Sequence, residues 1–371
     1  MPKSLINSRG HYKSKIVENR VSWKQWLLIK HDPLPALAFS FISKKNFSGG
    51  RYIPLFSEMK KLRVVTFYGT RFGKLDFLGL KLLRIFVKIT RKKQHKYRWI
   101  MSQGIDVANP KVNQIFNIDD PQYNSNEQNY ILSWEENLRM NGSKSIIVTT
   151  NKYTKLYLEN LKIVSPVHVI EQGHNDIRVR SKEKNSIFSC VYSSPYIDLG
   201  NDKHGNHPTW GSKLLITSII PMLIKKDPEI EIHLIGRVGK EARRYLKKYR
   251  RVILHGMKNY EDNFSIISKC HVGIYPRLFD NQRRVLKVYE YLGAGVPVVT
   301  FELEDTKMVR EKNVGISVKT PTEFIEAIIN LKQDRNLYSK FLRNIDLCGD
   351  ENSWTNLAMK YDNLIENNFY T

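Results

Sequence analysis

The chain has 371 residues, which is long enough for two domains, and its 60 Lys and Arg against 36 Asp and Glu give a formal net charge of +24. This excess favours polyanionic partners such as nucleic acid, an anionic lipid surface or a phosphorylated substrate. Three widely spaced cysteines argue against a disulfide framework or a zinc site. We find neither a signal sequence nor an apolar run of roughly 20 residues, which a membrane-spanning helix needs. We therefore expect a cytoplasmic protein.

The first half of the chain predicts an α/β domain, which we place at residues 1–172. Its strand candidates are short apolar runs between long polar stretches: residues 36–42, 62–68, 112–118, 144–150 and 167–172. The third run is followed at once by a tandem carboxylate, Asp119-Asp120. This pair either carries chemistry at the end of the strand or forms a turn, because Asp-Asp-Pro is a common loop former.

A basic segment lies between the second and third strand candidates. Residues 71–98 contain ten Lys or Arg and one acidic residue, Asp76. At helical spacing, Lys81, Arg84 and Lys88 lie on one side, and a set of Leu, Ile and Phe lies on the other. Such a helix suits an anionic membrane surface. The alternative is a helix that packs its apolar side on its own sheet.

The second half alternates strand candidates with helical stretches, which predicts βαβ units and a parallel sheet covered on both faces. The strand candidates are residues 189–194, 230–236, 252–256, 271–275, 296–301 and 314–318. We expect the second of them to end at Gly236-Arg237, in either a phosphate-binding loop or an ordinary turn. A charged, apolar-poor run after Gly173 marks the boundary of a second domain at residues 173–350. The tail, residues 351–371, predicts an amphipathic helix capped by Ser353.

The run KVYEYLGAGVPVV, residues 287–299, is the most informative stretch of the chain. We expect a helix that begins at Asp280 or Asn281 and ends at Gly293. Three charged side chains share one face of this helix: Arg283, Lys287 and Glu290. Gly293 and Gly295 then allow a sharp turn and the close approach of a ligand.

A charged helix face of this kind is either a solvated surface with an internal ion pair or part of a ligand site. In an open α/β sheet, ligands bind beyond the carboxyl ends of the strands, which is where this helix begins. There the first N–H groups of the helix can bind a phosphate. Lys287 can neutralise a diphosphate, and Glu290 can accept hydrogen bonds from ribose hydroxyls.

The pattern K-x-x-E-Y-L-x-A-G-x-P-V-V at residues 287–299 resembles the nucleotide-sugar signature of GT-B glycosyltransferases, especially family 4-like enzymes. VHVIEQGHND resembles their interdomain strand and turn. The resemblance implies two Rossmann-like domains facing across a cleft, with the acceptor on the first, the nucleotide sugar on the second, and the last helix crossing back to the first. It implies no cofactor and no obligatory metal, because helix N-termini and Lys or Arg side chains take the place of a metal.

The sequence departs from the family pattern in two places. Family members typically carry a second glutamate eight residues before the one that matches Glu290, and here that position is Gln282. Where they carry an early basic pair, this chain has Ser194 and Trp210. The phosphate charge must then be met by Lys287 together with Arg237, Arg277 or Arg283.

These departures leave both inverting and retaining chemistry open. An inverting transfer needs a base that takes the proton of the acceptor hydroxyl. Asp119 and Asp120 are the candidates for that base, because the strand before them is expected to point into the cleft.

One expected function and two alternatives follow. The expected function is a glycosyltransferase, peripheral on the inner face of a bacterial cell membrane, that moves a sugar from a nucleoside-diphosphate sugar, UDP-linked, to a hydroxyl of a lipid-linked glycan. The alternatives are a non-catalytic basic protein that binds nucleic acid or a membrane, and a sugar-nucleotide epimerase of the same fold. We recognise no nucleic-acid-binding module, so nucleic acid is not an expected partner. An epimerase needs acid and base groups around the sugar that the sequence does not locate.

Overall fold

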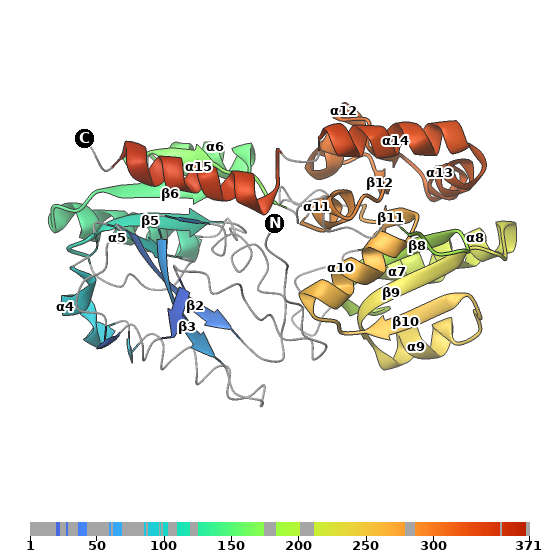
Figure 1. The fold of residues 1–371 in the computed structure, drawn as a ribbon, viewed down its shortest axis with the longest axis horizontal. Helices are drawn as coiled ribbons and strands as arrows, with labels where there is room; N and C mark the ends of the chain where they lie inside the picture. The colour runs from blue at the N-terminus through green and yellow to red at the C-terminus, as the bar shows by residue number, and fades with distance from the viewer. Residues whose placement is uncertain are drawn as a thin grey trace, which may run out of the picture. The chain divides into compact units, whose positions relative to one another are not determined.

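The computed structural model describes residues 20–22, 27–28, 36–42, 59–60, 62–68, 85–86, 88–95, 97, 99–102, 110–118, 125–173, 183–200, 211–278, 286–348 and 351–368. The chain forms two units: one comprises Met1–Glu171 and Leu357–Thr371, and the other comprises Gln172–Asn356. Each unit contains a parallel sheet and several helices (Figure 1). The α/β class predicted from the sequence is therefore confirmed.

The described part of the first unit contains a seven-stranded parallel sheet in the order β1-β3-β2-β4-β5-β6-β7. The strands are β1 (Arg20–Ser22), β2 (Ala36–Ile42), β3 (Leu62–Tyr68), β4 (Trp99–Ser102), β5 (Asn113–Ile118), β6 (Ser145–Thr149) and β7 (Val167–Val169). The helices are α4 (Arg91–Gln94), α5 (Ser125–Met140), α6 (Lys152–Asn160) and α15 (Trp354–Asn367). All five predicted strands are present. Strands β1 and β4 are additional, because runs of three or four residues are too short to show a periodicity.

Helix α15 brings the end of the chain into the first unit, from Leu357 onward. The Ser353 hydroxyl accepts a hydrogen bond from the Asn356 amide at 3.2 Å, which is the predicted cap. Farther along, the Tyr361 hydroxyl donates to Asn117 Oδ1 at 2.6 Å. Trp354 and Tyr361 lie on the buried face of this helix, as its apolar spacing predicts.

The described part of the second unit contains a six-stranded parallel sheet in the order β10-β9-β8-β11-β12-β13. The strands are β8 (Ser189–Ile197), β9 (Glu231–Val238), β10 (Val252–Gly256), β11 (Val272–Tyr275), β12 (Val298–Phe301) and β13 (Gly315–Val318). The helices are α7 (Ser212–Leu214), η2 (Leu215–Ile219), α8 (Ile220–Lys226), α9 (Lys240–Leu246), α10 (Tyr260–Lys269), α11 (Leu286–Gly293), η3 (Glu304–Thr306), α12 (Lys307–Glu311), α13 (Pro321–Gln333) and α14 (Arg335–Leu347). Counted along the chain, the strand order is 3-2-1-4-5-6, that of a doubly wound nucleotide-binding sheet.

Apolar side chains fill both faces of this second sheet. On β9, Ile232 and Leu234 join a core with the helices η2, α8, α9 and α13. Ile235, the next residue along the strand, points the other way into a core with α10 and α11. The sheet is therefore buried on both faces, as the Val- and Ile-rich strands predict.

Strand β9 continues to Val238, so the predicted end of this strand at Gly236-Arg237 is wrong. The register between β8 and β9 shifts between Ser193 and Tyr196, and pairing then resumes at Arg237. Gly236 has φ +143°, and a Cβ atom there would lie 1.7 Å from the Ser194 carbonyl oxygen. The bulge on one strand and the glycine on the other extend the ladder past the predicted turn.

Candidate functional site

The candidate site lies at the carboxyl ends of β8 and β11. These two strands are adjacent in the sheet, although β9 and β10 lie between them in the chain. The chain winds to one side after β8 and to the other after β11, so this is the switch point of the sheet. Ser193 and Ser194 end the regular part of β8, and Tyr275 ends β11. A ligand of an open α/β sheet is expected at this edge.

Two glycines let main-chain segments meet at this edge. Gly211 precedes α7 with φ +85°, and a Cβ atom there would lie 2.1 Å from the Pro276 carbonyl oxygen. Gly236 contacts Ser194 in the same manner from the other side. The start of the continuous helix formed by α7, η2 and α8 is thereby held against the end of β11, where its first N–H groups favour an anion.

Helix α11 carries the charged pair that the sequence singles out. Lys287 Nζ lies 2.7 Å from Glu290 Oε2, and the Glu290 side chain is only 7% exposed while that of Lys287 is 25% exposed. The internal ion pair of the alternative interpretation is present, but the Glu290 carboxylate is buried and not solvated. Gln282 and Arg283, with the expected caps Asp280 and Asn281, lie outside the described residues.

The predicted turn follows α11. Gly293 is the last residue of the helix, and Gly295 has φ +70°, which only glycine adopts readily. The Gly295 amide donates to the Leu292 carbonyl and the Val296 amide to the Tyr291 carbonyl, both at 2.9 Å. This pair of bonds closes the helix end and turns the chain directly into β12.

A group of buried tyrosines lies between these elements, and sequence reasoning missed it. The Tyr291 hydroxyl accepts a hydrogen bond from the Ser193 amide at 3.0 Å, which ties α11 to the end of β8. Gly273 on β11 makes room for the Tyr291 ring, since a Cβ atom would lie 2.5 Å from it. Burial raises the pKa of Tyr192, Tyr275 and Tyr291, so these phenols stay neutral at physiological pH.

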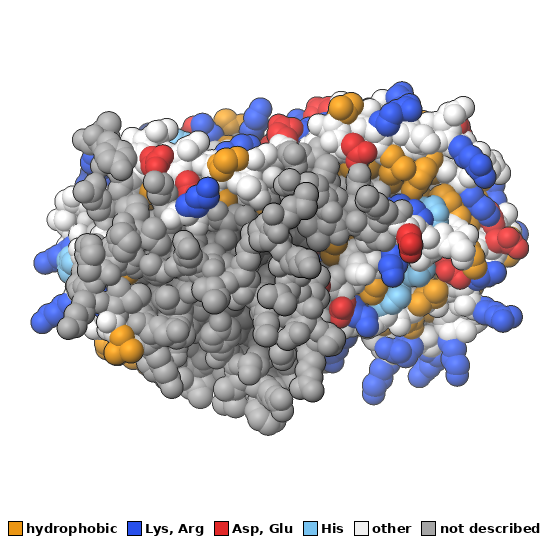
Figure 2. All heavy atoms as spheres, viewed as in Figure 1, with side chains coloured by type: hydrophobic (Ala, Val, Ile, Leu, Met, Phe, Trp, Pro, Cys, Tyr) orange, Lys and Arg blue, Asp and Glu red, His pale blue; other side chains and the backbone are white. Residues whose placement is uncertain are grey.

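Two of the three predicted arginines lie at this edge in different environments. Arg277 is 7% exposed and donates from Nη1 to the Tyr275 hydroxyl at 3.3 Å. Arg237 is exposed near the end of β9 and has no ion-pair partner among the described residues. Lys and Arg side chains also gather over α9, which begins at Lys240 immediately after β9 (Figure 2).

The remaining predicted site residues are described only in part. Asp119 and Asp120 lie outside the described residues, as do Lys81 and Arg84. Lys88 is described and exposed. Within the described segments, no three His, Cys, Asp or Glu side chains gather as a metal site would need. No helix of those segments has the length and apolar character to cross a bilayer.

Solved structures that align with this chain show its fold. TarM of S. aureus, in a complex that includes UDP, aligns over 77% of this chain and 58% of its own, with a TM-score of 0.57 and 14% identity. The pneumococcal O-GlcNAc transferase GtfA, with UDP and GlcNAc, aligns over 78% and 61%, with a TM-score of 0.56 and 13% identity. A Listeria monocytogenes protein described as a UDP-N-acetylglucosamine 2-epimerase aligns over 91% and 97%, with a TM-score of 0.57 and 10% identity. The chain has the GT-B fold, and it spans about three fifths of the length of the first two proteins.

The sequence comparison narrows this class for part of the chain. Residues 204–334 match the family described as Glycosyl transferases group 1, and this segment contains Lys287 and Glu290. No curated protein sequence matches the chain significantly. The resemblance to GT-B glycosyltransferases is therefore confirmed, and the narrower family 4-like assignment stays a prediction.

Proposed function

We propose that this protein is a glycosyltransferase that takes its sugar from a nucleoside-diphosphate donor, a UDP-sugar. The observation that carries the proposal is the Lys287–Glu290 pair with its buried carboxylate, on a helix that follows the switch point and within the segment that matches the family. UDP is favoured as the nucleotide because the solved structures of TarM and GtfA contain it.

The two charged side chains are proposed to bind different parts of the donor. The Lys287 ammonium contacts the diphosphate, and the Glu290 carboxylate, already oriented by Lys287 at 2.7 Å, accepts hydrogen bonds from the ribose hydroxyls. One lysine that also pairs with a carboxylate cannot neutralise the negative charge of a diphosphate. Arg237 is suited to supply further charge because it is exposed and carries no ion pair within the described residues. We propose that these side chains and the helix N-terminus at Gly211 replace a metal ion.

We propose further that the first unit binds the acceptor and that the acceptor is a glycan linked to a membrane lipid. Ile85 and Ile89 are 55% and 73% exposed, so they do not pack fully on the sheet of their own unit. Lys88, Arg91 and Lys92 are exposed beside them. Apolar and cationic side chains on one short segment suit an anionic lipid surface.

Calorimetry tests the donor site directly. UDP should bind the wild-type protein with 1:1 stoichiometry in a buffer that contains EDTA, and GDP and TDP should bind more weakly. Absence of UDP binding, or binding that requires a divalent cation, would contradict the proposed site. Product analysis by proton NMR, with a polyprenyl-diphosphate-linked sugar as acceptor, should then show both transfer and the anomeric configuration.

A sugar-nucleotide epimerase is the second candidate, because the Listeria monocytogenes protein matches this chain over nearly its whole length. The two functions differ in what they require. An epimerase converts UDP-N-acetylglucosamine without an acceptor, whereas a transferase leaves the donor unchanged apart from slow hydrolysis until an acceptor is added. Proton NMR of the donor incubated alone with the enzyme separates them.

A further inference from the structure

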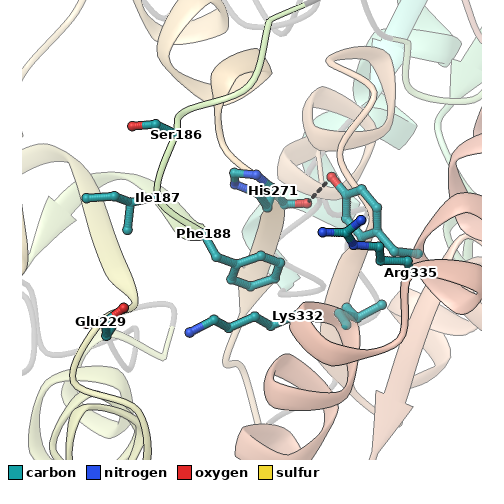
Figure 3. A pocket seen from close by; sticks show the side chains of 9 residues that line it. Ser186, Ile187, Phe188, Glu229, His271, Lys332 and Arg335 are labelled. Atoms are coloured by element: carbon teal, nitrogen blue, oxygen red, sulfur yellow. Dashed lines mark hydrogen bonds between the residues drawn. The ribbon is translucent and has the colours of Figure 1, made fainter.

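The second unit has a cavity of about 430 Å³ at the edge of its sheet opposite the candidate donor site (Figure 3). Phe188 precedes β8, Glu229 precedes β9, and His271 precedes β11. Because the strands are parallel, these three positions meet at the amino ends of the sheet. The cavity has the size of a small-molecule site, and none of its residues belongs to the proposed donor site.

Aromatic rings form one wall of this cavity. The rings of Phe188 and His271 are stacked, with centroids 4.8 Å apart and an interplanar angle of 28°. The Tyr338 ring lies 6.3 Å from that of His271, and the Tyr338 hydroxyl donates to the His271 carbonyl oxygen at 3.2 Å. These contacts hold the rings in place, so they offer a rigid apolar surface.

His271 contributes a hydrogen-bond donor to the same wall. The Ser189 amide donates to His271 Nδ1 at 3.2 Å, so the proton of the neutral ring is on Nε2. Burial and the nearby Lys184 lower the pKa of His271 to about 4, which keeps the ring neutral at physiological pH.

The charges of the cavity's polar rim are balanced once Asp227, which pairs with the rim residue Lys332, is included. Lys332 is joined to Asp227, with Nζ 2.5 Å from Oδ2. Arg335, in the first turn of α14, has no ion-pair partner among the described residues, and Glu229 lies on the opposite side of Phe188 and His271 (Figure 3). Two cations are thus balanced by two carboxylates, so the rim does not select a phosphate. It offers hydrogen-bond donors and acceptors around a flat apolar wall.

We propose that this cavity is a carbohydrate-binding site that takes one or two neutral pyranose rings. A pyranose has an apolar face of C–H groups that packs on an aromatic ring, and its hydroxyls both donate and accept hydrogen bonds. Glu229 accepts from these hydroxyls, while Arg335 and His271 donate to them. The inference does not rest on the proposed function, because the donor site shares none of these residues.

Saturation-transfer NMR tests this site on the full chain, with UDP present to occupy the donor site. The probes are glucose, N-acetylglucosamine and maltose, with UMP and inorganic phosphate as comparison ligands. We expect at least one saccharide to bind with a Kd of the order of 1 mM. Glu229→Gln combined with Arg335→Gln should weaken that binding at least tenfold, and Lys340→Gln, an exposed change elsewhere on α14, should not.

Three results would overturn the inference. One is the absence of a saccharide signal at concentrations about ten times the expected Kd. Another is an unchanged saccharide affinity in the double variant, which would place the sugar elsewhere. The third is binding of UMP or phosphate that the double variant loses, which would make the cavity an anion or nucleotide site. Both substituted side chains are exposed, so the double variant is expected to fold, and its unfolding temperature checks this.

Discussion

The Lys287–Glu290 pair predicts an asymmetry between two substitutions. Lys287→Met leaves a carboxylate that is 7% exposed without its partner, whereas Glu290→Gln leaves an ammonium that is 25% exposed and can reach water. Removal of one partner of a fully buried ion pair lowers the free energy of unfolding by about 3–5 kcal/mol. Because Lys287 is partly open to solvent, we expect a loss of about 2–4 kcal/mol for Lys287→Met. The cost of Glu290→Gln is expected to be about 1 kcal/mol, because the remaining lysine is hydrated.

Urea unfolding of the two variants measures this difference. A matched control exists in Lys307 and Glu304, which have the same i, i+3 spacing on the surface with side chains 46% and 39% exposed. Lys307→Met should change the free energy of unfolding little, because this pair is exposed to solvent. If Lys287→Met is no more costly than Lys307→Met, the burial argument for Glu290 is wrong.

The same variants test the proposed donor site. Glu290→Gln should weaken UDP binding by about 1.5–3 kcal/mol, a factor of roughly 10 to 150, because charge-assisted hydrogen bonds to the ribose are lost. Lys287→Met should weaken it by a similar factor at the diphosphate, and Lys307→Met should leave it unchanged. Calorimetry that finds wild-type affinity for UDP in both site variants would refute the assignment.

Further predictions concern stability, pH, the membrane and the base. Lys184→Met should destabilise the second unit by roughly 2–4 kcal/mol in urea unfolding, because Lys184 Nζ donates to the carbonyl oxygens of Ser268, Cys270 and Gly295 at 3.0, 2.9 and 3.2 Å; a loss below 1 kcal/mol would contradict this. Burial, with cationic or histidine neighbours, lowers the pKa of His255 and His271 to about 4. Between the ordinary pKa of 6.5 and pH 4, the unfolded chain therefore binds more protons than the folded chain. The free energy of unfolding thus falls as the pH is lowered through that window. At about 1.4 kcal/mol per pKa unit, reduced by solvent screening of these half-buried rings, we expect a loss of about 1–2 kcal/mol between pH 7 and pH 4.5, and a flat profile after correction for carboxylates would speak against it. Changing Lys88, Arg91 and Lys92 to Gln should weaken binding to phosphatidylserine vesicles by about 1 kcal/mol per charge and leave binding to neutral vesicles unchanged. If the wild-type protein does not bind anionic vesicles at low salt, the membrane proposal is wrong. One of Asp119→Asn or Asp120→Asn should lower kcat by about 10²–10⁴-fold with UDP affinity unchanged, and near-normal kcat in both would remove them as the base.

Local patterns in the sequence were sufficient for most of the strands. Two strands were predicted as short runs rich in apolar and β-branched residues, ALAFSFI at residues 36–42 and LRVVTFY at residues 62–68. The structure has β2 and β3 at the same residues. Helical spacing likewise placed Lys287 and Glu290 on one face, and the 2.7 Å contact follows from the i, i+3 geometry of a single helix. Both inferences use residues that are neighbours in the chain.

Tertiary contacts decided what those patterns left open. The depth of Glu290 depends on what covers α11, so spacing alone indicated a charged face but not a buried carboxylate. The length of β9 was set by the bulge in β8 and by the close contact of Gly236 with Ser194, which lies 42 positions earlier. The cavity joins Phe188, Glu229 and His271, three residues that are far apart in the sequence and meet only because parallel strands align their amino ends. Periodicity reports the environment of one element, whereas burial and convergence depend on which elements pack together.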